Sequence, residues 1–175
     1  DDDTLEKVVG AILAKNNLTL ATAESCTGGL LSHRLTNIPG SSNYFLGGLI
    51  TYNNESKIKL LNVNPDTLAA HGAVSPQTAV AMAQGVRQAM AANIGIGITG
   101  IAGPGSAQTT KPVGLVYIGL DFQGQVQVRQ EAFSGQRQEI KFRAAQSSLY
   151  MLWRHLQKQK TANCNQQPYD PRIIT

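Results

Sequence analysis

Residues 19–29 read TLATAESCTGG, and this stretch decides the architecture of the chain. The apolar and β-branched run at 19–23 predicts a short strand, and the glycines at 28 and 29 open a helix that we expect to reach Asn37. A strand that leads through a glycine-rich turn into a helix is typical of α/β folds. We therefore expect strands that lie in one sheet with helices packed against it.

Strands and helices continue to alternate on both sides of this stretch. We predict further strands at 48–53 and 94–99, and helices at 4–16, 55–61, 65–71, from Ser75-Pro76 onward and after Ser134-Gly135. The pair Gln123-Gly124 separates two strand-like runs, 113–122 and 125–133, and predicts an antiparallel hairpin. This hairpin turns one strand against the others. The pattern predicts an α/β fold, a three-layer α/β/α sandwich with a mixed, mostly parallel sheet of about five strands.

Length and composition indicate one folded domain. The chain has 175 residues, of which 42% are hydrophobic and 15% charged, so it can form a proper core. We expect a single domain over 1–160 and a polar, loosely ordered tail over 161–175. The chain starts with three aspartates and no methionine, which is consistent with a domain taken from a longer protein.

Charge and cysteine content argue against several classes of function. The net charge is only +4, and the seven of fifteen basic residues between 129 and 160 do not interleave with aromatics as in a nucleic-acid platform, so no nucleic-acid partner is expected. The two cysteines cannot form a disulfide framework, no Cys/His spacing suits zinc, and we predict neither a metal nor a cofactor. No apolar run approaches ~18 residues and no signal peptide opens the chain, so we expect no membrane partner and a cytoplasmic location.

The turn at 23–29 is the first candidate site. A glycine-rich turn before a helix exposes backbone N–H groups that suit a phosphate or a carboxylate, although a plain structural turn fits the same residues. Cys26 could act as a nucleophile. None of the three histidines lies in a recognisable partner motif, so a small buried side chain is the simpler interpretation of this cysteine.

Two further segments, 40–45 and 51–57, contain the serine, tyrosine and lysine that a histidine-free hydrolase would need. Lysine can accept a proton from serine only when it is neutral, which burial or a nearby cation can achieve by lowering its pKa. On spacing alone, turn residues and an exposed lysine are the favoured interpretation of these segments. The long loop at 100–112 follows a strand, at the sheet edge where α/β folds usually bind ligands.

Taken together, these segments resemble the CinA C-terminal domain family, also called the PncC type of nicotinamide mononucleotide amidohydrolase. The resemblance covers most of the chain from about Leu20 to Trp153. The matching stretches occur in family order: TAESCTGG at 22–29, PGSS at 39–42, YNNESK at 52–57, HGAVS at 71–75, TGIAGP at 99–104, KPVG at 111–114 and FSGQR at 133–137.

The resemblance implies hydrolysis of nicotinamide mononucleotide to nicotinate mononucleotide and ammonia, in a homodimer that takes part in pyridine nucleotide salvage. It also implies a catalytic group of Ser42, Tyr52 and Lys57. As a hypothesis, Ser42 attacks the carboxamide, Lys57 accepts its proton and Tyr52 relays it. The residues we expect to contact the substrate lie in three of the segments: Glu24, Ser25, Thr27, Gly28 and Gly29; Thr99, Gly100 and Gly103; and Arg137.

Two questions stay open in the sequence. A strand of about seven residues between Ser42 and Lys57 spans ~23 Å, so the two meet only if the Ser42 turn folds back or a neighbouring subunit supplies one of them. The 5′-phosphate is expected at 27–29 or at the Thr99-Gly100 loop, with Arg137. The alternative function is a non-catalytic partner-binding domain of a competence- or damage-inducible protein.

Overall fold

The computed structural model describes residues 3–105 and 110–164. Five strands form the sheet: β1 (Leu20–Glu24), β2 (Phe45–Ile50), β3 (Ile94–Gly100), β4 (Leu115–Phe122) and β5 (Gln125–Ala132). Six α-helices accompany them in the described residues: α1 (Leu5–Lys15), α2 (Leu30–Thr36), α3 (Asn54–Leu61), α4 (Pro65–His71), α5 (Pro76–Ala89) and α6 (Arg137–Cys164). A 3₁₀ turn, η1 (Ser41–Asn43), precedes β2.

The strands lie in the order β2-β1-β3-β4-β5. β1 pairs in parallel with both β2 and β3, whereas β4 pairs antiparallel with β3 and with β5. Four strands therefore point in one direction and β4 alone points in the other. This arrangement confirms the predicted mixed, mostly parallel sheet of five strands and the predicted hairpin.

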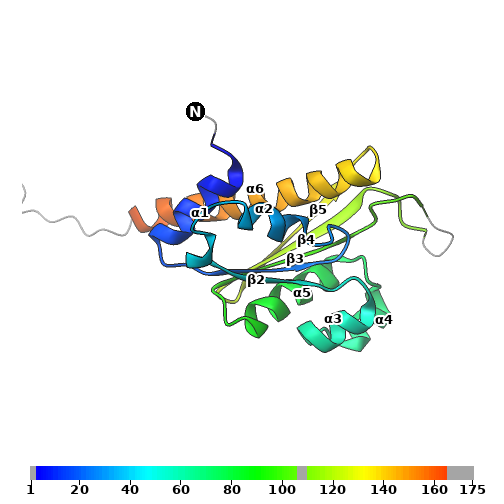
Figure 1. The fold of residues 1–175 in the computed structure, drawn as a ribbon. Helices are drawn as coiled ribbons and strands as arrows, with labels where there is room; N and C mark the ends of the chain where they lie inside the picture. The colour runs from blue at the N-terminus through cyan, green and yellow to red at the C-terminus, as the bar shows by residue number, and fades with distance from the viewer. Residues whose placement is uncertain (1–2, 106–109, 165–175) are drawn as a thin grey trace, which may run out of the picture.

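Helices cover both faces of this sheet, as Figure 1 shows, with α1, α2 and α6 on one face and α3, α4 and α5 on the other. The predicted three-layer sandwich is confirmed. The two faces have separate apolar clusters, one including Leu13, Ile96 and Leu149 and the other including Met82 and Val86. α5 lies very close to the sheet because β3 and β4 carry glycines there. A Cβ at Gly97 would come within 2.4 Å of the Ala79 carbonyl oxygen.

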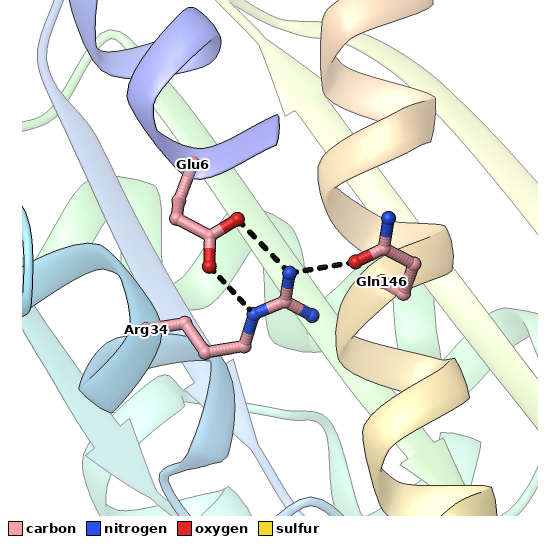
Figure 2. Close-up of polar contacts among 3 residues, drawn as sticks. All are labelled: Glu6, Arg34 and Gln146. Carbon is pink, nitrogen blue, oxygen red and sulfur yellow. Dashed lines mark hydrogen bonds and ion pairs between the residues drawn. The ribbon is translucent and has the colours of Figure 1, made fainter. Parts of the chain in front are cut away.

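A buried polar contact joins the three helices of one layer. Figure 2 shows Arg34 of α2 between Glu6 of α1 and Gln146 of α6. The guanidinium donates through Nε and Nη2 to the two carboxylate oxygens of Glu6, at 3.1 and 3.0 Å, and through Nη2 to Gln146 Oε1 at 2.6 Å. Both charged side chains are about nine-tenths buried. The contact fixes how these helices pack on the sheet.

Two boundaries differ from those expected. We predicted the second strand at 48–53, but β2 occupies Phe45–Ile50. Asn53 instead caps α3, with its side chain accepting a hydrogen bond from the Ser56 N–H at 2.8 Å, and this cap ends the extended segment early. Tyr52 therefore lies beyond the strand. At the other end of the chain, α6 continues to Cys164, past the predicted start of the tail at 161, and the rest of that tail lies outside the described residues.

Candidate functional site

The connections that follow β1, β2 and β3 meet at one edge of the sheet, because these three strands are parallel. A cavity of about 250 Å³ lies between these connections. Its wall is formed by residues from five parts of the chain: Ser25 and Cys26; Tyr52 and Lys57; Ala73 and Val74; Thr99 to Pro104; and Arg137.

Ser25 and Lys57 form the polar centre of this cavity. Ser25 directly follows β1, and its position is fixed by a 3.0 Å hydrogen bond from its N–H to the Ile98 carbonyl of β3. Lys57 lies in the first turns of α3, and its Nζ donates hydrogen bonds to Ser25 Oγ at 3.3 Å and to the carbonyl oxygen of Thr51 at 2.8 Å. A serine hydroxyl thus lies within proton-transfer reach of an amine.

Lys57 is almost completely buried, with only 1% of its surface exposed. Burial disfavours the charged ammonium and lowers the pKa of Lys57 to about 8, and the nearby Cys26 opposes this shift. A large share of Lys57 is therefore neutral at mildly alkaline pH. A neutral amine beside a serine hydroxyl can act as a general base.

Arg137, the first residue of α6, closes one side of the cavity mouth. Its Nη2 donates a 2.9 Å hydrogen bond to the hydroxyl of Tyr52, and its Nη1 donates to the carbonyl oxygen of Gly103. Tyr52 itself is 61% exposed. The guanidinium therefore connects the segment after β2 to the loop after β3 at the wall of the cavity.

Comparison with known proteins shows the family to which this chain belongs. The family model of the CinA C-terminal domain matches residues 2–156. The chain belongs to the CinA C-terminal domain family. A Moorella thermoacetica protein named as competence-damage inducible is 68% identical over 159 residues, which are 91% of this chain but 38% of the relative. The chain therefore spans well under half the length of this curated relative.

Solved structures agree with the family assignment. A CinA superfamily protein from Klebsiella pneumoniae has a TM-score of 0.86 at 31% identity, over 88% of this chain and 96% of that one. A competence/damage-inducible protein from Agrobacterium tumefaciens has a TM-score of 0.83 at 39% identity, over 87% of this chain and 93% of that one. The CinA fold thus accounts for nearly the whole described domain.

The structure does not bring Ser42 to the other two residues predicted to be catalytic in this CinA domain. Ser42 is exposed in η1, before β2, whereas Tyr52 and Lys57 follow the strand. The Leu20 N–H at the start of β1 bonds to the Tyr44 carbonyl, which places this turn at the opposite edge of the sheet from the cavity. The Ser42 turn does not fold back along β2, so within one chain the serine beside Lys57 is Ser25.

Glu24 was expected to contact substrate, but its carboxylate already has four donors. It accepts hydrogen bonds from the backbone N–H groups of Gly29, Leu31 and Ser32, at 3.1, 3.0 and 2.8 Å, and from the Ser32 hydroxyl at 2.6 Å. The side chain is fully buried. Glu24 therefore neutralises the N-terminus of α2, where the sequence suggested that a phosphate would bind.

The other predicted contact residues fall into two groups. Ser25, Thr99, Gly100, Gly103 and Arg137 line the cavity. Those at 27–29 do not, since the threonine is fully buried and the two glycines have φ values of +61° and +95° that form the turn into α2. The part of the predicted 100–112 loop at 106–109 lies outside the described residues.

Cys26 lies beside the pair but is poorly suited to act as the nucleophile. It is 5% exposed and lines the cavity. Burial, together with the charge of Glu24, raises the pKa of its thiol to about 12, which suppresses the reactive thiolate.

In the described residues, no three His, Cys, Asp or Glu side chains gather as metal ligands, and no helix is long and apolar enough to cross a membrane.

Sequence reasoning missed the pairing of Ser25 with Lys57 and the contribution of Ala73 and Val74 to the wall. Ser25 was considered only as a substrate contact. The signal that could have found the pair is topological: in parallel neighbouring strands, residues just after the strand ends lie together. Ala73 and Val74 carry no functional side-chain group that would have marked them as part of a cavity.

Proposed function

We propose that this CinA domain hydrolyses the carboxamide of nicotinamide mononucleotide, giving nicotinate mononucleotide and ammonia. The observation that carries the proposal is the 3.3 Å contact between Ser25 Oγ and Lys57 Nζ at the cavity wall. A buried amine with a lowered pKa is the base that a serine requires when histidine is absent. The motif resemblance points to the substrate, and the buried pair supports the chemistry.

In the proposed reaction, Ser25 Oγ attacks the carboxamide carbon while its proton passes to neutral Lys57. The tetrahedral intermediate collapses as the C–N bond breaks, and Lys57 returns the proton to the departing nitrogen, which leaves as ammonia. Water then attacks the acyl ester on Ser25 while Lys57 accepts a proton from it, the C–O bond to Ser25 Oγ breaks as Lys57 returns that proton to Oγ, and the product acid is released and ionises to nicotinate mononucleotide. The Thr51 carbonyl orients the amine throughout, through its 2.8 Å hydrogen bond.

Two further groups have supporting roles in this proposal. Backbone N–H groups at 26–27, in the turn that carries Ser25, are the candidate donors to the oxyanion. Tyr52 accepts a hydrogen bond from Arg137 at the mouth. Its hydroxyl proton therefore stays available for the departing ammonia or the incoming water. In this proposal Tyr52 takes part in the reaction, as predicted, from the mouth of the cavity.

The test is to incubate the purified 175-residue chain with nicotinamide mononucleotide near pH 8.5 and to measure ammonia. We expect steady ammonia release from the wild type and none above background from Ser25→Ala, with both proteins folded by circular dichroism. A folded wild type that binds the nucleotide and releases no ammonia would contradict the proposal. That result would favour the non-catalytic, partner-binding role.

The predicted homodimer and cytoplasmic location remain predictions. Because Ser25 and Lys57 belong to the same chain, the proposed reaction does not require a residue from a second subunit. Sedimentation of the active protein would give its oligomeric state without affecting the assignment of the pair.

A further inference from the structure

β5 is an edge strand whose outer side is open. It pairs with β4 on one side, and among the described residues no strand pairs with its other side. The Phe133 N–H donates to the Gly114 carbonyl just beyond this ladder, and inward and outward groups alternate along an antiparallel strand. The N–H and C=O groups of Val126, Val128 and Gln130 therefore point away from the sheet. An open row of this kind can pair with another chain.

The face of β5 that is turned toward α5 is apolar. Val128 pairs with Gly119, and a Cβ at Gly119 would clash with the Ala79 carbonyl oxygen of α5, so both residues face that helix. Val126 and Val128 are each 44% exposed, so α5 leaves part of this face uncovered. A pocket of about 450 Å³ lies between β5, α4 and α5, and Val128 and Val80 line it. Apolar side chains of an added strand can pack there.

The opposite face of β5, which is turned toward α6, is positively charged. Arg129 pairs with Ile118, whose side chain belongs to the apolar cluster that α6 covers. Arg154 and Lys158 lie four residues apart, so they share one side of α6. These three cations line a second pocket, of about 480 Å³, between β5 and α6. Val128 contributes to both pockets, so the apolar and the basic pocket adjoin at β5.

The cations of the basic pocket have too few acidic partners. Glu131 pairs with Arg129. Arg154 and Lys158 are exposed and have no hydrogen bond or ion pair with any residue that the structure describes. Burial lowers the pKa of His155 in the same pocket, and the positive charge of Lys158 lowers it further. The charges therefore produce a positive potential that an acidic partner would neutralise.

We propose that the outer edge of β5 binds an extended segment of a partner chain in which acidic residues alternate with apolar ones. Side chains of a strand point alternately to its two faces, so the acidic set meets Arg154 and Lys158 while the apolar set packs on Val126 and Val128. The backbone of the segment extends the sheet by one strand. The inference goes beyond the proposed hydrolysis and does not depend on it, because none of these residues lines the cavity of the reactive pair.

The first experiment compares three labelled peptides of eight residues by fluorescence anisotropy. In the first peptide glutamate alternates with valine, in the second lysine replaces every glutamate, and in the third four valines precede four glutamates. We expect the first peptide to bind about 10-fold more tightly than either of the others, and its affinity to fall as salt is added. Equal binding of the three peptides, or no binding of the first, would overturn the inference.

Val128→Pro tests whether the peptide is added as a strand. Proline removes an outward N–H but no hydrogen bond to β4, so the variant should fold and bind the first peptide about 10-fold more weakly. Circular dichroism checks its fold. A test without any change to the protein uses two further peptides, N-methylated at the valines or at the glutamates. Only one of them should lose binding, because one edge of an added strand faces β5. Equal affinities of these two peptides, or unchanged binding by folded Val128→Pro, would exclude strand addition.

The double variant Arg154→Met with Lys158→Met tests the charges. We expect it to weaken binding of the first peptide by about 3- to 30-fold, as for two exposed ion pairs. The matched control, Lys141→Met with Arg143→Met, removes the same two charges from the same helix ~15–25 Å away and should change the affinity little. An equal loss in the two double variants would mean that net charge alone attracts the peptide, which contradicts the inference.

Discussion

Ser25 and Lys57 lie 3.3 Å apart at the cavity wall, although 32 positions separate them in the chain. Parallel pairing of β1 with β2 brings them together, because each residue follows the carboxyl end of its own strand. The contact between Ser25 and Lys57 therefore depends on strand pairing in the sheet rather than on a flexible loop.

Ser25→Ala should reduce turnover of nicotinamide mononucleotide by ~10³-fold or more, as removal of a nucleophile does in other covalent hydrolases. Ser42→Ala should stay within about threefold of the wild type, because Ser42 lies at the other edge of the sheet. Steady-state ammonia release from both folded variants shows whether Ser25 or Ser42 is the nucleophile. An inactive Ser42→Ala beside an active Ser25→Ala would return the nucleophile to Ser42, supplied by a neighbouring subunit.

The rate should depend on pH through Lys57. The general base has to be neutral, and burial lowers the pKa of Lys57 to about 8. We expect kcat/KM to rise as pH increases through about 8 and to level off above it. Lys57→Arg retains a charge that cannot be lost at accessible pH, so it should be as inactive as Lys57→Ala. An active Lys57→Arg would show that the residue only positions a charge.

Lys57→Met should make the protein more stable as well as inactive. The pKa of Lys57 is lower in the folded state than its ordinary 10.5, so burial of the ammonium costs about 3 kcal/mol below pH 8. We expect an unfolding free energy about 1–3 kcal/mol higher than that of the wild type at pH 7. As pH rises from about 8 to 10.5, the folded wild type loses the proton that its unfolded chain keeps. The difference in unfolding free energy between Lys57→Met and the wild type should therefore narrow. Urea unfolding at pH 7 and pH 10 measures this, and an equal gap at both values would contradict the lowered pKa.

Glu24→Gln should affect the stability of α2 more than substrate affinity. An amide retains one acceptor oxygen but presents an NH₂ group to the backbone donors at 29–32, so we expect a loss of about 2–4 kcal/mol. Hydrogen exchange of the amides of Leu31 and Ser32 should accelerate. Glu139→Gln is the control, since that exposed carboxylate accepts one backbone hydrogen bond, and it should cost about 1 kcal/mol or less. A Glu24→Gln protein with normal stability and a raised KM would make Glu24 a substrate contact after all.

Glu6→Gln should destabilise the helical layer drawn in Figure 2 by about 2 kcal/mol at pH 7, since it leaves Arg34 buried without its counter-ion. Burial raises the pKa of Glu6, but the hydrogen bonds and charge of Arg34 outweigh it and the net shift is downward. Its contribution is therefore present above pH 4.5 and disappears as pH falls through the lowered pKa. The difference between variant and wild type should close in acid. Asp3→Asn, in an exposed pair with Lys7, should cost less than about 0.5 kcal/mol at any pH.

The fold was largely predictable because its signals are local. Alternating apolar patterns, the cap residues Asn64 and Ser75, and the turn at Gln123-Gly124 all placed elements correctly. The error at β2 arose because apolar and aromatic residues continue to Tyr52, while the side-chain cap at Asn53 ends the extended segment. Such competition between a cap and a strand is decided by tertiary packing rather than by periodicity.

The site was only partly predictable, because its contacts are long-range. Lys57 was identified as a candidate base, and its burial could not be read from residues 51–57, which look like a polar turn and an exposed helix. Glu24 was predicted to contact the substrate because it lies in the motif at 22–29. Only the positions of the α2 amides show that the carboxylate serves the protein itself.

Different segments of the chain form the reactive pair and the mouth of the cavity, so the two can change independently as such domains diversify. The serine and its base follow β1 and β2, whereas the mouth is formed by the loop after β3 and the start of α6. Mutations at the mouth can therefore alter which molecules enter without disturbing the serine and the lysine. Mutations of the serine or the lysine can likewise leave the mouth unchanged. Under the proposed function, changes at 101–105 and at the start of α6 would alter the amide substrate while Ser25 and Lys57 stay unchanged.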